Sequence, residues 1–537
     1  MTGKIDRAWP FGARRPSWGP GKRIWPDRSG PGRLRHEQAG RAGHRGLGRS
    51  IGLFAALLIL SCAPSEDATT PPNLILISLD TCRADRLSCY GAERDNTPAL
   101  DALADEAVRF TDCIASSSLT APSHMSLFTG QSVQRHGVLT NRWGVTPPAT
   151  LATLLRDAGW RTAAFTGGGS MQAIHGVDTG FDTFQSEVGE RTWPFTRNIA
   201  DVTPHALRWL DGVGRAPVFL FVHGYDPHCP YVPPEPYRST YGGWYDGGQS
   251  FDAVCGPQAF SAEFEAGKVG DDELRWINDL YDAEIRAADE AIGAFLDALR
   301  ERDLLERSIV VFLSDHGEIL GRQRWVGHGM LWEEALRVPL LIRFPASLRR
   351  QVQERLIGAP VQLADVLPTV LEALGQPLPA GLQGTSLMPL VRDEVSPFDE
   401  HRLRVSRVGN QVSARFGDRW KIVFQEAVDA VDGRPVVAED IAFSGIRELY
   451  DLQADPLEDK NLIQTPEGAA HFDQLANLYA RWRFEAAKDD ERYRGRDWRA
   501  VDRPEDERAL KALGYTGEEE PTLPGEGGAD EQDSVPR

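Results

Sequence analysis

The chain has few cysteines, no internal repeat and only a short hydrophobic run near its N-terminus. Its 537 residues include six cysteines. Setting Cys62 aside leaves five, so at least one stays free or pairs between chains, and cysteine usage gives only weak support for export. The apolar run at residues 51–61 has the length of a signal peptide and is too short to span a bilayer. The run is therefore not predicted to be a membrane-spanning helix.

Positive charge is also scarce once the first 50 residues are set aside. The whole chain carries 59 Lys and Arg against 78 Asp and Glu, a net charge of −19. Residues 1–50 contribute +9, so the remainder carries −28. An acidic surface repels phosphate backbones, which argues against a nucleic acid as partner.

The N-terminal segment is predicted to be an export signal. The apolar run follows a basic leader and ends in Ile59-Leu60-Ser61-Cys62, which resembles a bacterial lipobox. We expect residues 1–62 to be leader and signal peptide, with Cys62 lipidated, and residues 63–72 to be a tether. The protein would then be exported and anchored in the bacterial cell envelope, in the periplasm or at the outer membrane. An ordinary secretory signal cut nearby is the alternative.

Two short apolar strings end in potential metal ligands. Residues 73–80 end in Asp80, and residues 308–316 end in Asp315 and His316. Both strings are typical of buried parallel strands. Ligands bind at the carboxyl ends of strands in open α/β sheets, so these side chains are expected to meet at one edge. Taken singly, each residue could equally be an ordinary turn residue.

A third string, Ser118–Gly130, has the pattern of a turn that leads into a helix. Thr120 stands where the helix begins, and Pro122 lies in its first turn. The free N–H groups and positive dipole end of a helix N-terminus suit an anionic, tetrahedral substrate. Together with Asp80, Asp315 and His316, the Thr120 hydroxyl would complete a divalent-metal site. On its own, the string could be only a helix cap.

The pattern of the rest of the chain indicates an α/β protein. From residue 73 to about 390, apolar strands alternate with helices; for example, a helix at 274–302 precedes the strand at 308–313. We expect a catalytic domain over residues 73–395 and a smaller C-terminal α+β subdomain over residues 396–515. Residues 516–537 are acidic and rich in Gly and Pro, which predicts a disordered tail.

Five strings together resemble the sulfatase family of the alkaline phosphatase superfamily. They occur in the family's order: Leu79–Leu87, Thr97–Ala104, His223–Tyr231, Gly327–Pro339 and Glu448–Leu462. The resemblance implies an alkaline phosphatase-like mixed sheet between helices. It also implies a metal-dependent hydrolase of sulfuric or phosphoric esters.

The sequence departs from the family at the nucleophile. Typical members carry Cys-x-Pro-Ser-Arg, in which the Cys, or sometimes a Ser, is oxidised to formylglycine. Here the string is Thr120-Ala121-Pro122-Ser123-His124. Oxidation of a secondary alcohol gives a ketone, so no formylglycine is expected. A threonyl sulfate has no easy exit, whereas water can resolve a threonyl phosphate. Thr120 is therefore predicted to be a nucleophile that favours phosphoric or phosphonic esters.

The resemblance implies one divalent metal ion on Asp80, Thr120, Asp315 and His316. Many members have a second acid after the first, where this chain has Thr81. Fewer carboxylates and one imidazole favour zinc or manganese, with calcium as the alternative.

Two further histidines are assigned by the same resemblance. His228 is expected to contact the transferred group, and His328 to contact the ester oxygens. An imidazole can protonate a leaving oxygen near neutral pH. Cys82 lies close to Asp80 but off the nucleophile motif, and is interpreted as packing or half of a disulfide.

A protein of another class remains open at this stage. A non-catalytic module with a retained sulfatase fold could bind anionic glycans or lipid headgroups. The presence of all the site residues argues against such a module. The expected partner is an anionic ester of a small molecule, a glycan or a lipid headgroup. No nucleic acid is expected, and contact with a membrane would come only through the lipid anchor.

Overall fold

The computed structural model describes residues 71–147, 149–186, 197–394, 402–431, 434–437, 443–487 and 498–500. They all belong to one compact unit, residues 64–537. The predicted leader, the lipobox with Cys62, most of the tether and the acidic tail lie outside the described residues. No helix in the described ranges is long and apolar enough to cross a membrane.

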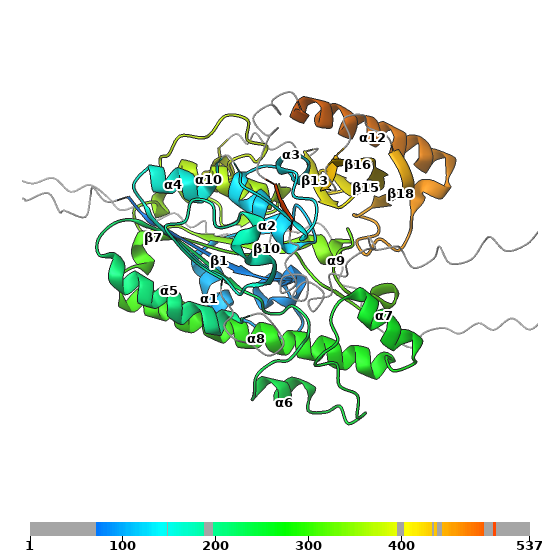
Figure 1. The fold of residues 1–537 in the computed structure, drawn as a ribbon, viewed down its shortest axis with the longest axis horizontal. Coiled ribbons are helices and arrows are strands. Elements are labelled where there is room, and N and C mark those ends of the chain that lie inside the picture. Colours follow the sequence, from blue (N-terminus) through cyan, green and yellow to red (C-terminus); the bar gives the residue numbers. More distant parts are fainter. Residues whose placement is uncertain are drawn as a thin grey trace, which may run out of the picture. The chain divides into compact units, whose positions relative to one another are not determined.

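A mixed β-sheet forms the centre of this unit (Figure 1). In spatial order the strands are β11 (Leu356–Ile357), β2 (Val108–Ile114), β10 (Arg337–Arg343), β7 (Ser308–Ser314), β1 (Asn73–Leu79), β6 (Val218–Gly224), β4 (Arg161–Phe165) and β5 (Thr183–Gln185), with β12 (Val361–Gln362) also paired to β2. Five neighbouring strands, from β7 through β1, β6 and β4 to β5, run parallel, and β10 is antiparallel to both β7 and β2.

The central strands are buried on both faces, as their continuous apolar sequences predict. All seven residues of β1 and of β7 are buried. Along β1, Leu74 and Leu76 face one hydrophobic core, whereas Ile75 and Ile77 face the other. The sheet is therefore the middle layer of three.

Helices supply the outer layers (Figure 1). On one face of the sheet lie α1 (Pro98–Glu106), α5 (Ile199–Val213) and α8 (Asp271–Glu301), and α7 (Pro257–Glu265) contributes to the same hydrophobic core from beside α8 (Figure 1). The other face packs against α2 (Thr120–Thr129), α4 (Leu151–Asp157), α10 (Val366–Ala373) and α11 (Met388–Val391). The long helix predicted at 274–302 starts three residues earlier, where three acidic residues in the first turn complement the helix dipole.

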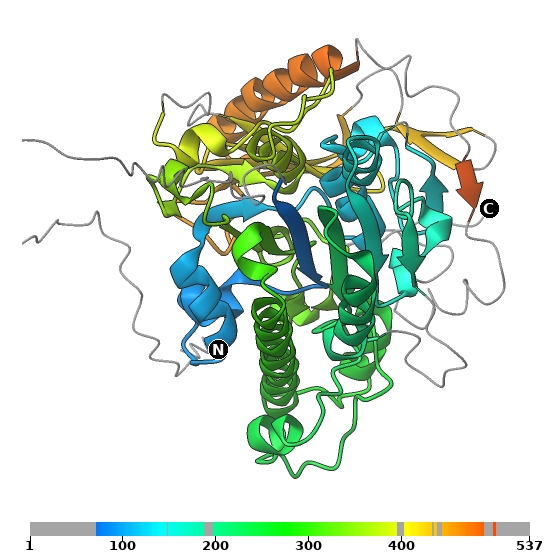
Figure 2. The same ribbon diagram turned by 90° about the vertical axis from the view of Figure 1, so that its left-hand side faces the viewer.

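A second, antiparallel sheet follows in the chain. It contains β13 (Leu403–Val408), β14 (Gln411–Phe416), β15 (Trp420–Glu426) and β18 (Phe443–Asp451), and α12 (Pro466–Ala487) packs on it through a separate core. In both views α12 lies on one side of the main sheet and α8 on the opposite side (Figures 1 and 2). The predicted fold class, with its C-terminal α+β subdomain, is confirmed. The boundary at 395/396 lies outside the described residues and stays a prediction.

Short elements complete the described chain. They are the helices α3 (Val133–His136), α6 (Tyr237–Gly242) and α9 (Glu333–Leu336), and the strand pairs β8 (Ile319–Leu320) with β9 (Val326–Gly327), β3 (Trp143–Val145) with β19 (Trp498–Ala500), and β16 (Val428–Val431) with β17 (Arg434–Val437). The β8–β9 pair matters most here, because it carries one of the predicted site histidines at its end.

The second sheet is joined to the main sheet by buried polar contacts. The guanidinium of Arg404 on β13 donates to Asp112 Oδ2 on β2 at 2.8 Å. The Ser406 hydroxyl donates to the carbonyl of Ala115 at 2.6 Å. Ala115 opens the segment that leads from β2 to the start of α2. The small sheet therefore supports the segment that positions Thr120.

Candidate active site

The carboxyl ends of β1 and β7 bring three predicted ligands together. The register pairs Leu79 with Ser314, so Asp80 and Asp315 leave the two strands side by side. Asp80 Oδ, Asp315 Oδ and a ring nitrogen of His316 all lie within 4.8 Å of one another. All three side chains are fully buried. The convergence predicted for them is therefore what the structure shows.

Thr120 joins this cluster from α2. Its Oγ1 lies 3.4 Å from Asp80 Oδ2 and 3.4 Å from His316 Nε2. Thr120 is the first residue of the helix, Leu119 is its N-cap, and no side chain caps the helix there. The Thr120 hydroxyl thus faces the cluster and does not serve as a helix cap.

His124, one turn along α2, fixes the start of that helix. Its Nδ1 donates to the Thr120 carbonyl at 2.9 Å, so Nε2 is the acceptor for the Ser78 hydroxyl at 3.0 Å. Ser123 Oγ donates to the backbone carbonyl of Asp315 at 2.7 Å. His124, which stands where the family motif usually has Arg, therefore links the start of α2 to β1.

The cluster has the donor atoms that a cation requires. His316 Nδ1 donates to the Gly317 carbonyl at 3.0 Å, which leaves the lone pair of Nε2 for a ligand bond. Asp80 Oδ1 and Asp315 Oδ2 are buried and accept no hydrogen bond within the described residues. Buried carboxylate oxygens without partners are costly, and a divalent metal ion would satisfy both.

The pKa values in the cluster follow from burial. Burial raises the pKa of Asp80 to about 8. Burial and the charge of Asp80 raise the pKa of Asp315 well above its ordinary value. Burial lowers the pKa of His316 well below its ordinary value, so its imidazole is neutral, the form that binds metals. A bound cation would favour the ionised form of both carboxylates.

The backbone beside Asp80 adopts a conformation that is rare outside glycine. Thr81 has φ of 59°, a left-handed value that costs a β-branched residue on the order of 1–3 kcal/mol. Its N–H donates to Asp315 Oδ1 at 3.2 Å, and its carbonyl accepts from the Tyr281 hydroxyl at 2.7 Å. The turn thereby orients the carboxylate of Asp315.

The two predicted substrate histidines lie on loops beside the cluster. The ring of His328 is 4.7 Å from that of His316 and 4.9 Å from that of His228, measured between centroids. His228 Nδ1 donates to the carbonyl of Cys229 at 2.6 Å. Burial lowers the pKa of His228 to about 3. The three histidine rings therefore lie next to one another beside the carboxylate cluster.

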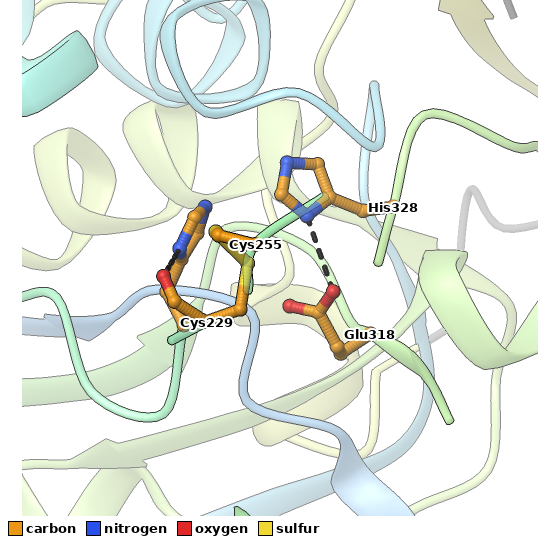
Figure 3. Close-up of a disulfide and its surroundings, with 5 residues drawn as sticks. Cys229, Cys255, Glu318 and His328 are labelled. Atoms are coloured by element: carbon orange, nitrogen blue, oxygen red, sulfur yellow. Dashed lines mark hydrogen bonds and ion pairs between the residues drawn. A yellow bond between two sulfur atoms is a disulfide. The ribbon is translucent and has the colours of Figure 1, made fainter. Parts of the chain in front are cut away.

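A disulfide joins Cys229 to Cys255 next to these histidines (Figure 3). Cys82, interpreted above as packing or half of a disulfide, is a buried free thiol, and Cys89 and Cys113 are free as well. Burial raises the pKa of the Cys82 thiol above its ordinary value, which leaves it unreactive. Cys82 therefore packs, and the loop cysteines form the bridge.

Two acids and a histidine near the site were not assigned a contact from sequence. Asp226 Oδ2 accepts from the Ile199 N–H at 2.7 Å and so anchors the loop to the start of α5. His223 Nε2 lies 3.6 Å from Asp80 Oδ2. Glu318 Oε1 accepts from His328 Nδ1 at 3.4 Å. The only sequence signal for Glu318 was its place directly after Asp315-His316-Gly317.

With this geometry in place, the family can be decided. The sulfatase family model matches residues 72–376, more than half of the chain. The chain belongs to the sulfatase family. An N-acetylglucosamine-6-O-sulfatase from Bacteroides thetaiotaomicron is 25% identical, over 79% of this chain and 88% of the relative. An ulvan-active sulfatase from Formosa agariphila is 25% identical, over 89% and 92%.

Solved structures agree with this sulfatase fold. A phosphonate monoester hydrolase from Agrobacterium radiobacter superposes with a TM-score of 0.60 at 22% identity, over 77% of this chain and 96% of that one. A second phosphonate monoester hydrolase, from Silicibacter pomeroyi, gives a TM-score of 0.61 at 20% identity, over 77% and 96%. The sulfatase assignment makes this chain an ester hydrolase, and sulfatases bind a divalent metal ion.

Proposed function

We propose that this sulfatase-family hydrolase cleaves phosphate or phosphonate esters, with Thr120 as the nucleophile. The observation that carries the proposal is the position of Thr120 Oγ1, 3.4 Å from both Asp80 Oδ2 and His316 Nε2. A secondary alcohol cannot yield the aldehyde hydrate that expels sulfate. Its phosphoryl ester can be resolved by water.

Asp80, Thr120, Asp315 and His316 would hold the metal ion. Two carboxylates, one imidazole and one hydroxyl favour zinc or manganese over calcium, which prefers a cage of oxygen ligands. When bound, the ion would lower the pKa of the Thr120 hydroxyl and neutralise charge on the transferred group.

The protein's own groups support an in-line displacement. Asp80 Oδ2 accepts the proton of the Thr120 hydroxyl, and Thr120 Oγ1 forms the bond to phosphorus. The N-terminus of α2 directs its dipole at the anionic group. His228 binds an oxygen of the transferred group, and His328 protonates the leaving oxygen. A water molecule then attacks phosphorus and gives a proton to His328, the bond from phosphorus to Thr120 Oγ1 breaks, and the proton held by Asp80 returns to Thr120.

The substrate class follows from the same residues. We propose an anionic ester of a small molecule, a glycan or a lipid headgroup. Turnover of an aryl sulfate, an aryl phosphate and an aryl phosphonate ester with the same leaving group shows which ester class the enzyme prefers. We expect faster turnover of the phosphorus esters, and faster sulfate turnover would refute the preference.

The nucleophile has its own test. Thr120→Ala should lose several orders of magnitude in kcat, because a member of the catalytic unit is removed. Thr120→Ser should retain part of the activity, because a primary hydroxyl can still attack. Near-normal turnover by Thr120→Ala would mean direct attack by water and would overturn the mechanism.

We also propose that the protein is exported and anchored to the bacterial cell envelope through a lipid on Cys62. The Cys229–Cys255 disulfide supports an oxidising compartment. Mass spectrometry of the mature N-terminus should find a lipidated Cys62. Cys62→Ser should release soluble protein or block processing. A mature N-terminus at another residue would refute the anchor.

A further inference from the structure

Glu318 is a buried carboxylate that has no role in the proposed metal site or in the nucleophilic attack. It directly precedes β8, and His328 directly follows β9. The register of this two-stranded pair places Ile319 opposite Gly327, so Glu318 and His328 are the next pair across the ladder. Glu318 is fully buried, and His328 is 5% exposed. The hairpin thus brings an acid to a histidine through its backbone pairing.

The contact between the two side chains sets the orientation of the ring. A carboxylate only accepts hydrogen bonds, so His328 Nδ1 is the donor to Glu318 Oε1. The other ring nitrogen, Nε2, points away from Glu318 (Figure 3). Because the His328 ring lies 4.7 Å from that of His316 and 4.9 Å from that of His228, it is one of the groups of the proposed site.

Both strands of the hairpin are fixed from outside. Arg83 Nη1 donates to the backbone carbonyl of Glu318 at 3.1 Å. Gly327, at φ of 125°, packs on Pro257, and a Cβ there would lie 2.9 Å from Pro257 Cδ. Pro257 follows two residues after the disulfide cysteine Cys255. The distance between the two partners is therefore set by the fold and not by loose side chains.

We propose that Glu318 is a positioning residue that acts through His328. It accepts the Nδ1–H hydrogen bond of the protonated imidazole, so that the proton on Nε2 is the one presented to the leaving oxygen, and the ring keeps its Nδ1 proton after the Nε2 proton has been transferred. This inference rests on the proton-donor role proposed for His328. It predicts that Glu318 matters most when the leaving group needs a proton.

The test compares leaving groups on whichever ester class the wild-type enzyme cleaves, with a phenyl and a 4-nitrophenyl ester. Glu318→Ala should lower kcat on the phenyl ester about 10- to 100-fold, with KM nearly unchanged. On the 4-nitrophenyl ester the loss should be about tenfold smaller, because 4-nitrophenolate departs without protonation. Glu318→Gln keeps an acceptor and should recover part of the activity.

A double-mutant comparison shows whether Glu318 acts through His328. In a His328→Ala background, Glu318→Ala should change kcat by less than about twofold. Losses that multiply, or an equal loss on both leaving groups, would overturn the positioning role. If Glu318→Ala does not fold, the same comparison with Glu318→Gln decides the question.

Glu284→Gln is the matched control. Burial raises the pKa of Glu284 well above its ordinary value, which favours the neutral carboxyl, and Glu284 Oε1 accepts from the Val232 N–H at 2.7 Å. Glutamine preserves both features, and the leaving-group dependence should stay as in the wild type. The leaving-group test uses whichever ester class the wild-type enzyme cleaves. An active Thr120→Ala variant would therefore refute the role of Thr120 as nucleophile, while the effect of Glu318→Ala on the two leaving groups could still be measured.

Discussion

The site has two halves that the fold builds in different ways. Asp80, Asp315 and His316 stand at the ends of adjacent central strands, whose backbones are paired along their whole length. His228 and His328 stand on loops, held by a disulfide and by a two-stranded hairpin. The strand half resembles the sites of open α/β sheets in general, whereas the loop half depends on a disulfide and on a hairpin outside the main sheet. In the proposed mechanism, binding of the cation and protonation of the leaving group therefore depend on separate parts of the fold.

The largest expected effect comes from breaking the strand half. Asp315→Ala removes an anionic ligand, so both bound metal and turnover should disappear, the latter by more than about a thousandfold. Elemental analysis of the purified variant measures the first quantity. Stoichiometric metal in Asp315→Ala would refute the ligand assignment.

Breaking the loop half should leave the metal in place. His228→Ala should keep stoichiometric metal while kcat/KM falls about a hundredfold, because the transferred group loses a contact. The same elemental analysis and steady-state kinetics apply. Loss of metal from His228→Ala would show that the loop half also contributes to metal binding, and would contradict the division of the site into two halves.

Opening the disulfide should have a smaller effect of the same kind. A dithiol reductant, or Cys229→Ser with Cys255→Ser, frees the segment that follows His228 and the segment that leads to Pro257. We expect a roughly tenfold loss of kcat/KM with metal retained, and about 2–4 kcal/mol less stability. The double variant is the control, since reductant should not change it further. Full activity after complete reduction would show that the disulfide does not position the loop.

The smallest effect on turnover is expected from Asp226→Asn, which tests the anchor of the loop half. Burial raises the pKa of Asp226 to about 7 from an ordinary 3.8, so the folded state keeps a proton that the unfolded state releases. This stabilising contribution is complete below about pH 4 and is lost as the pH rises through about 7. The free energy of unfolding of wild type should therefore fall relative to Asp226→Asn over that range, by at most about 1.4 kcal/mol per pH unit. A difference that does not change with pH would contradict the raised pKa.

The sequence predicted the strand half well for a physical reason. Apolar runs such as residues 73–79 define buried parallel strands, and a polar residue directly after such a strand can only lie at its carboxyl edge. Asp80, Asp315 and His316 followed from that rule, and Thr120 followed from helix-start chemistry and from the family pattern. The alternation of apolar strands and helices predicted the α/β class, the family resemblance implied the mixed sheet, and the small antiparallel sheet lies in the predicted C-terminal α+β subdomain.

The loop half could be predicted only in part. The family pattern pointed to His228 and His328 but not to what holds them. Pairing Cys229 with Cys255 requires the path of the chain between them, and the five cysteines after Cys62 allow many pairings. Glu318 became visible only when the β8–β9 register placed it opposite His328. His124 was noted as a departure from the family motif, but its bond to the Thr120 carbonyl depends on helix geometry.

The central claim is that Thr120 forms a covalent bond to phosphorus during turnover. Acid quenching of the enzyme with an aryl phosphate or phosphonate substrate, followed by peptide mass spectrometry, tests it directly. We expect a phosphoryl or phosphonyl group on the peptide that contains Thr120, and its absence from Thr120→Ala. Full turnover of such an ester with no modified Thr120 under any quench condition, or modification of another residue, would contradict it.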